Sequence, residues 1–116
     1  MHRRFYILEE QVNNLRNMGL DVNAVGSCAY SVLDYDNISY TEERTMILQD
    51  ILDVLIGSGL FPTLYYVGGL TGHWACTVGC IGSEEQIAKT SLDAAYLVLY
   101  DCLQRGLISK NYLIQK

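Results

Sequence analysis

Apolar and polar positions along this chain recur with periods that predict helices and strands in turn. Residues 5–18 carry an apolar residue at every third or fourth position, which is typical of an amphipathic helix, and Gly19 follows as a stop signal. Residues 27–34 have a strand-favouring composition, and a loop rich in Tyr and Asp is expected to continue to Tyr40. The apolar positions of the first helix are Phe5, Leu8, Val12, Leu15 and Met18.

The clearest helical pattern spans residues 41–57, where one apolar stripe alternates with acidic and amide side chains. Thr41 is suited to cap the N-terminus of this helix, and the acidic residues after it stand where the helix dipole favours negative charge. Gly57 or Gly59 is expected to end the helix, because Pro62 prevents it from continuing.

Residues 61–82 predict two strands joined by a glycine-rich turn. Side chains alternate between the two faces of a strand, so the second strand has a heavy face and a light one. The heavy face is expected to meet the core, and the small residues of the light face would let another layer or another subunit approach closely. The heavy face is Trp74, Cys76, Val78 and Cys80, and the light face is His73, Ala75, Thr77, Gly79 and Ile81.

The last third of the chain predicts a further helix and a packed tail. Residues 83–86 have the form of a capping box, which favours a short helical turn. A second start signal at Thr90 opens a helix over 91–105 that is apolar nearly all round, so we expect it to be buried on more than one side. Gly106 ends it, and the tail over 107–116 is apolar enough that it is expected to pack on the domain or on a neighbour.

These elements predict a single α+β domain over residues 1–116, in which a small antiparallel sheet packs against helices in an α-β-α sandwich-like arrangement. A length of 116 residues suits one domain, and a chain that is 50% hydrophobic and 18% charged is too apolar to be disordered. The mean hydropathy of +0.12 is high for a small soluble monomer. Together with the all-round apolar helix over 91–105 and the small-residue face of the second strand, it predicts a homo-oligomer.

Composition also argues against several classes of partner. The net charge of −5 disfavours binding to nucleic acid, which requires a basic surface. No apolar run reaches the roughly 18–20 residues that a membrane span needs. The first residues do not resemble a signal peptide, so we expect a cytoplasmic protein whose four cysteines are reduced thiols.

His73, Cys76 and Cys80 are the residues that come nearest to a metal or nucleophile motif. On a strand, however, the two cysteines lie on one face about 13 Å apart, at roughly 3.3 Å per residue, and His73 points to the other face. Zinc needs all its ligands within about 2.3 Å, and a Cys–His pair needs hydrogen-bond contact. We therefore expect buried structural thiols, no metal, no other cofactor and no catalytic residues.

The glycine-rich turn over 68–72 is the only candidate for a phosphate-binding loop. Backbone N–H groups of such loops bind phosphate when the loop leads into a helix N-terminus. Here the loop leads into a strand and has no adjacent Lys. The pattern therefore favours a hairpin turn with residues at positive φ.

Residues about 40–105 share the order of elements of a known group of small proteins. A helix is followed by a strand pair whose second strand opens with Trp74, then by a loop and by a helix that starts at a Ser/Thr-x-x-Ala-like sequence. The matching segments are 41–56, 64–67, 73–75 and 91–97. This order resembles the small phage-encoded "phage ABA sandwich" domains and the related proteins typified by the lambda NinX product. The resemblance implies a small α/β protein of phage or prophage origin that binds a host protein or a host signalling molecule, and it carries over no catalytic residue.

Aromatic side chains are the better functional signal, because Tyr and Trp give large contact area at low entropic cost. Two functions stay open: a non-enzymatic inhibitor that binds a host antiviral-defence protein, or an oligomeric sponge that sequesters a nucleotide second messenger. In the second case, stacking would fall to Tyr and Trp and phosphate binding to Arg. The predicted binding residues are Tyr35, Tyr40, Arg44, Tyr65, Tyr66, His73 and Trp74.

Overall fold

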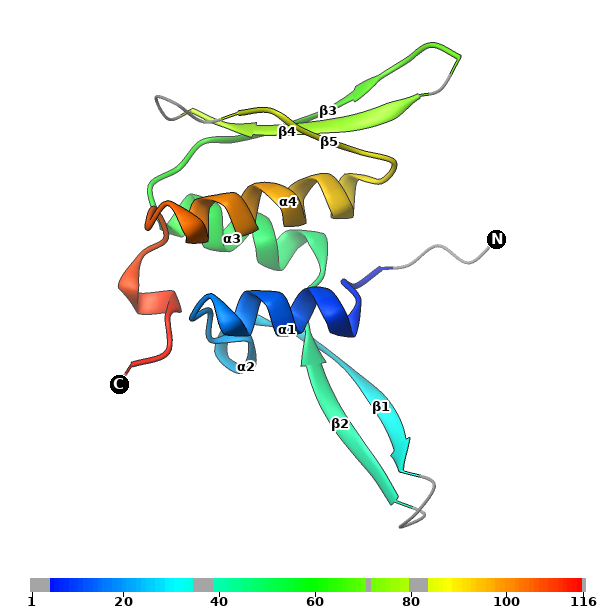
Figure 1. Cartoon of the computed structure of the whole chain (residues 1–116), viewed down its shortest axis with the longest axis vertical. Helices are drawn as coiled ribbons and strands as arrows, with labels where there is room; N and C mark the ends of the chain where they lie inside the picture. Colours follow the sequence, from blue (N-terminus) through cyan, green and yellow to red (C-terminus); the bar gives the residue numbers. More distant parts are fainter. Residues whose placement is uncertain (1–4, 35–38, 71, 80–83, 116) are drawn as a thin grey trace.

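Four α-helices, a short 3₁₀ helix and two antiparallel sheets make up the part of the chain that the computed structural model describes, residues 5–34, 39–70, 72–79 and 84–115 (Figure 1). The α+β class is confirmed. The molecule is a flat body with extents of 48 × 42 × 18 Å. None of the helices in these ranges combines the length and the apolar character needed to cross a bilayer.

Helix α4, Ser91–Gln104, lies between the three-stranded sheet on one side and helices α1 and α3 on the other (Figure 1). The hydroxyl of Thr90 caps it by accepting a hydrogen bond from the Asp93 N–H at 3.0 Å, as the start signal predicted. Gly106, with φ of 71°, follows its last turn. The prediction of a helix buried on more than one side is confirmed by its buried residues, which are Leu92, Ala94, Ala95, Tyr96, Val98, Leu99, Cys102 and Leu103.

The three-stranded sheet has the order β3-β4-β5 and is antiparallel throughout. Its strands are β3 (Pro62–Val67), β4 (His73–Val78) and β5 (Gln86–Ala88). The predicted hairpin over 61–82 is therefore confirmed in β3 and β4. The helical turn predicted over 83–86 is wrong at its end, because Gln86 begins a strand whose backbone pairs with β4; residues 80–83 lie outside the described ranges.

The heavy face of β4 meets α4, as expected. Cys76 and Val78 are buried, and Trp74 packs against the same cluster at the edge of the helix layer. The register places Leu64 of β3 beside Cys76 and Ala88 of β5 beside Trp74. Since cross-strand neighbours share a face, all five side chains cover α4 from the same side.

The other sheet is a two-stranded hairpin that projects from the opposite side of the helices (Figure 1). It consists of β1 (Cys28–Asp34), at the position predicted for a strand, and β2 (Ser39–Thr45). The prediction that a helix begins at Thr41 is wrong, because this segment pairs along its whole length with β1. Helix α3 begins only at Leu48 and runs to Gly57. Here strand pairing prevails over a local helix-start signal.

Helix α1, Glu9–Asn17, and the short helix α2, Val22–Val25, form the layer below α4. Val12 and Leu15 are buried as predicted. Phe5, predicted to lie in the helix, is 77% exposed, because residues 5–8 run extended beside the start of α3. Ile7 is buried there instead, and its N–H donates to the Met46 carbonyl at 3.0 Å.

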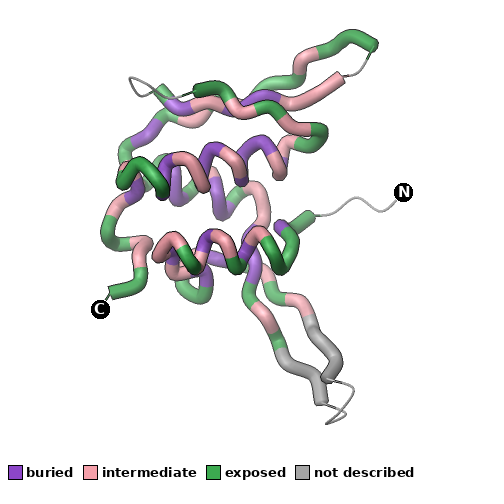
Figure 2. Tube along the Cα trace, in the orientation of Figure 1, coloured by how far each residue is buried: buried purple, intermediate pink, exposed green. Residues whose placement is uncertain are grey.

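The C-terminal segment packs on the domain, as its apolar composition predicted. Its 3₁₀ helix η1, Lys110–Tyr112, is followed by Leu113, which forms an antiparallel bridge with Leu20. The Asp21 N–H donates to the Tyr112 carbonyl at 2.9 Å, and Ile108 is buried. The segment thereby closes the edge between α1 and α2. Figure 2 shows buried positions concentrated where the helices and β4 face one another.

A buried carboxylate joins the two halves of the fold. Asp50, in the first turn of α3 and 7% exposed, accepts three hydrogen bonds through Oδ2. The donors are the Ile47 N–H at 2.9 Å, the Ser27 N–H at 3.0 Å and the Ser27 hydroxyl at 2.9 Å. One side chain thus caps α3 and holds the turn that leads from α2 into β1.

We predict that Asp50→Ala lowers the free energy of unfolding by about 2 kcal/mol, because it removes the acceptor of three part-buried hydrogen bonds. Denaturant unfolding measures the change. The matched control is Asp53→Ala on the exposed side of the same helix, where the carboxylate accepts only from the Gln49 side chain at 2.8 Å. The control is expected to cost less than about 0.5 kcal/mol. Equal losses for the two variants would contradict this role of Asp50.

Candidate functional site

One face of the β3-β4-β5 sheet packs on α4, and the opposite face is open. Strand alternation and the register put Thr63, Tyr65 and Val67 of β3 on the open face. Phe61, immediately before β3, follows the same alternation and is 74% exposed, and Ile87 of β5 is 53% exposed. His73, Ala75 and Thr77 of β4 lie between the two flanking strands. We call this surface the open face.

Tyr65 is held across the middle of the open face. Its hydroxyl donates to the carboxylate of Glu85, which lies next to β5, so the side chain spans β4 from one edge strand to the other. The residue beneath this path is Ala75, which pairs with Tyr65 and Ile87 and is fully buried although no helix covers it. Tyr65 therefore has a structural role as a cover, and 40% of it stays exposed for contact.

Tyr66 and Trp74 form an aromatic pair on the α4 side of the sheet. Their ring centroids are 5.5 Å apart, with an interplanar angle of 61°, which is an edge-to-face contact. Gly72 makes the position of Tyr66 possible, because a Cβ on that glycine would fall 1.8 Å from the Tyr66 hydroxyl. Tyr66 is 58% exposed, so the pair presents an aromatic edge near the hairpin tip.

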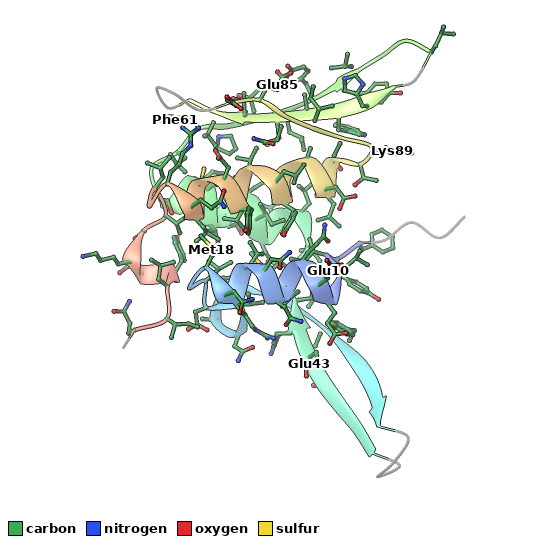
Figure 3. All side chains as sticks on the ribbon, in the orientation of Figure 1. Glu10, Met18, Glu43, Phe61, Glu85 and Lys89 are labelled. Carbon is green, nitrogen blue, oxygen red and sulfur yellow. The ribbon has the colours of Figure 1, made fainter. Side chains whose placement is uncertain are left out.

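The structure separates the residues predicted to form one site. Tyr65 and His73 lie on the open face, and Tyr66 and Trp74 lie on the other face of the same hairpin. Arg44 is exposed on β2, on the other side of the helices from the β3-β4-β5 sheet. In Figure 3 the label of Glu43 marks the end of the molecule that carries β2, and the labels of Phe61 and Glu85 mark the β3-β4-β5 sheet. For Tyr40 the structure gives only its place in β2, paired with Leu33, and Tyr35 lies outside the described ranges.

Phe61 and Ile87 are exposed on the open face and were not among the predicted binding residues. Phe61 could have been found by extending the strand alternation by one residue before Pro62. Ile87 carried no usable signal, because residues 83–86 favour a helix locally and β5 exists only through pairing with β4. Between these two side chains, β4 contributes only the small or polar residues His73, Ala75 and Thr77, so the surface is shallow.

Another pair of aromatic rings lies at the base of the β1–β2 hairpin. Tyr6 and Tyr30 stack with ring centroids 5.7 Å apart and an interplanar angle of 3°. Burial raises the pKa of Tyr30, and the carboxylates of Glu9 and Glu43 act in the same direction. Arg16 pairs with Glu43 at 3.8 Å beside this stack. The rings therefore join the N-terminal segment to β1 and have a structural role.

The chemistry of the hairpin thiol is that of a core residue. Cys76 is fully buried against α4, and His73 lies on the open face, so the predicted separation of these two side chains is confirmed. Burial raises the pKa of the Cys76 thiol to about 11, which keeps it protonated and unreactive at neutral pH. Within the described ranges, no group of three or more His, Cys, Asp or Glu side chains could hold a metal ion. Cys80 lies outside them.

Comparison with known proteins gave no match: not to a protein-family model, not to a curated protein and not to a solved structure. The resemblance to the phage-encoded family therefore stays a prediction from the order of elements.

We predict that Cys76 resists thiol reagents in the folded protein. At pH 8 its alkylation is expected to be at least about 100-fold slower than that of a model thiol, since it is buried and protonated. The half-buried Cys28 is the internal control, and peptide mass spectrometry separates the two. Equal rates for Cys28 and Cys76 without denaturant would contradict the burial.

The same shift in pKa gives a pH dependence of stability. The folded state holds the Cys76 proton more tightly than the unfolded chain, whose thiol titrates near 9.0. Its contribution to the free energy of unfolding is therefore constant below pH 9 and falls between pH 9 and about 11. Cys76→Ala is expected to flatten this decline, and an unchanged decline would contradict the assignment.

Proposed function

We propose that this protein is a non-enzymatic phage or prophage accessory protein that binds and inhibits a host protein, an antiviral-defence component, in the host cytoplasm. The open face of the β3-β4-β5 sheet is the proposed docking surface. The observation that carries the proposal is the exposure of Phe61, Tyr65 and Ile87 on one side of a sheet whose other side is packed.

Several features of the open face suit protein binding. Recognition surfaces concentrate aromatic and aliphatic anchors in a centre that carries few charges. The open face offers Phe61, Tyr65 and Ile87 as anchors. Between them, Thr77 can form hydrogen bonds without the desolvation cost of a charge, and His73 adds a further hydrogen-bonding group. The Tyr65 hydroxyl is already bonded to Glu85, so little side-chain entropy is lost when a partner covers that ring.

The origin of the protein and the class of its target rest on the sequence resemblance. That resemblance implies binding of a host protein or a host signalling molecule, and the net charge of −5 disfavours nucleic acid as the partner. The apolar anchors of the open face favour a protein, so we place the proposed target among host proteins.

The alternative function, a sponge for a nucleotide second messenger, has less support. The Tyr66–Trp74 pair is the surface best able to stack a base. A phosphate group would need cations beside it. The described arginines lie elsewhere: Arg16 on α1, Arg44 on β2 and Arg105 at the far end of α4 from the Trp74 neighbour Ala88. Lys89, which directly follows Ala88, is a single cation near the pair. The acidic net charge also disfavours a polyanionic ligand.

We predict that Ile87→Arg abolishes capture of the host target and relief of the host defence, because it replaces one of the apolar anchors of the docking surface by a charge. Immobilised protein is incubated with host lysate, and bound proteins are quantified by mass spectrometry beside a plaque assay. The control is Ile56→Arg, which changes a side chain of similar exposure, 58% against 53%, on helix α3. The control is expected to behave as the wild type, and equal loss in both variants would contradict the proposed surface.

The nucleotide alternative gives a different outcome. A thermal-shift screen against cyclic and ADP-ribose-type nucleotides is expected to leave the melting temperature unchanged. A rise of several degrees that disappears in Trp74→Ala would overturn protein binding as the function and favour the sponge.

A further inference from the structure

Strand β3 is an edge of its sheet, so every second residue directs its backbone N–H and C=O groups away from β4. The hydrogen bonding between the two strands shows which residues these are. The Gly79 N–H donates to the Phe61 carbonyl at 3.2 Å, which places this pair at a hydrogen-bonded position of the antiparallel ladder. Counting on in steps of two, Thr63, Tyr65 and Val67 also direct their backbone groups toward β4. Leu64 and Tyr66 must then direct their N–H and C=O groups outward. Pro62 also stands at an outward position, where its lack of an N–H removes no hydrogen bond to β4.

The other strand edges are short or carry charges, which oppose pairing with a further strand, whereas β3 carries such a feature only in Pro62, its first residue, outside the stretch from Leu64 to Tyr66. Strand β5 has only three residues and stands between Glu85 and Lys89. Gln86 and Ala88 direct their backbone groups toward β4, so Ile87 is the one residue of β5 whose N–H and C=O point outward. The strands of the other hairpin contain charged residues, Asp34 in β1 and Glu42, Glu43 and Arg44 in β2. Short length and charge are the usual protections of an exposed edge. Strand β3 reads Pro-Thr-Leu-Tyr-Tyr-Val, without a single charge.

We propose that β3 pairs antiparallel with β3 of a second copy of this chain, which joins the two sheets into one of six strands. One register uses every outward N–H and C=O group of Leu64 and Tyr66. In it, Leu64 lies opposite Tyr66 of the second copy, and by symmetry Tyr66 lies opposite Leu64 of the second copy. About four backbone hydrogen bonds then form, and Tyr65 faces Tyr65 of the second copy on the two-fold axis.

A second copy fits this edge for three reasons. Two chains of net charge −5 repel each other, and β3 brings them together along a segment without charge. The pairs formed, Leu with Tyr and Thr63 with Val67, are combinations of aromatic, aliphatic and β-branched residues that stabilise antiparallel sheets. The joined sheet ends at β5 on both sides, and since that edge is short and flanked by charges, assembly stops at two copies.

This dimer differs from an oligomer contact through the helix over 91–105, one of the two contacts that the sequence suggested. Eight of the 14 residues of helix α4 are buried within a single chain, so its apolar side is already covered. The two-fold axis stands perpendicular to the sheet, because an antiparallel pair within one sheet keeps each face on its own side. Both open faces then lie side by side on the same surface, whether or not they bind a host protein. The dimer does not depend on the proposed function.

Tyr65→Cys tests the pairing directly. Directly opposed residues of a non-hydrogen-bonded pair have Cα atoms about 4.5 Å apart, within the range that a disulfide spans. Under mild oxidation this variant is expected to form a covalent dimer through residue 65, identified by peptide mass spectrometry. Ile87→Cys, on the same face but two strands away, is the matched control and is expected to stay uncross-linked. A disulfide through residue 87 but not through residue 65 would overturn edge pairing in favour of stacked open faces.

Sedimentation equilibrium supplies a second, non-covalent test. The wild type is expected at twice its 13.1 kDa chain mass at about 100 µM. Tyr65→Lys places like charges opposite each other on the axis and is expected to raise the dimer dissociation constant at least about tenfold. Its charge can still pair with Glu85, so folding is preserved, which circular dichroism checks. Ile87→Lys is expected to dimerise as the wild type. A wild-type protein that is monomeric at this concentration would overturn the proposal.

Discussion

The burial of α4 on two sides is the constraint on which the rest of this structure depends. A helix that is apolar nearly all round cannot stand at a surface, so it needs cover both above and below. The sheet supplies one cover through Leu64, Cys76 and Val78, and α1 and α3 supply the other. Since the helices all lie on one side of the sheet, the opposite side has nothing to pack against within the described part of the chain. The open face is thus a consequence of how α4 is buried.

The elements that the sequence predicted correctly are those with local signals. Helix α4 has its Thr90 cap, its apolar pattern and Gly106, and the β3–β4 hairpin has alternation and a glycine turn. The elements predicted wrongly are strands that exist through pairing. Both β2 and β5 begin in segments that resemble helix starts, and only the partners β1 and β4 make them strands. A capping signal is worth about 1 kcal/mol, which a full ladder of backbone hydrogen bonds outweighs.

The candidate site could be predicted only in part, for the same reason. Strand alternation correctly placed His73 and Cys76 on opposite faces of β4. It could not reveal that Tyr65 is bonded to Glu85 across β4, because that contact depends on the unforeseen strand β5. Phe61 and Ile87, the most exposed apolar side chains of the open face within the described ranges, became visible only once the sheet was assembled. The sequence shows that β3 carries no charge. Which of its backbone N–H and C=O groups point outward is known only from the Gly79–Phe61 hydrogen bond in the structure.

We propose that the two faces of one small sheet have different tasks, one in stability and the other in recognition. Hydroxyl-radical footprinting of the protein, first alone and then bound to its captured host target, tests this division. We expect Phe61 and Ile87 to react strongly in the unbound protein and to be protected in the complex, while Phe5 and Ile56 react equally in both states. Protection of Tyr6 and Tyr30 at the base of the β1–β2 hairpin, with Phe61 and Ile87 unchanged, would contradict it.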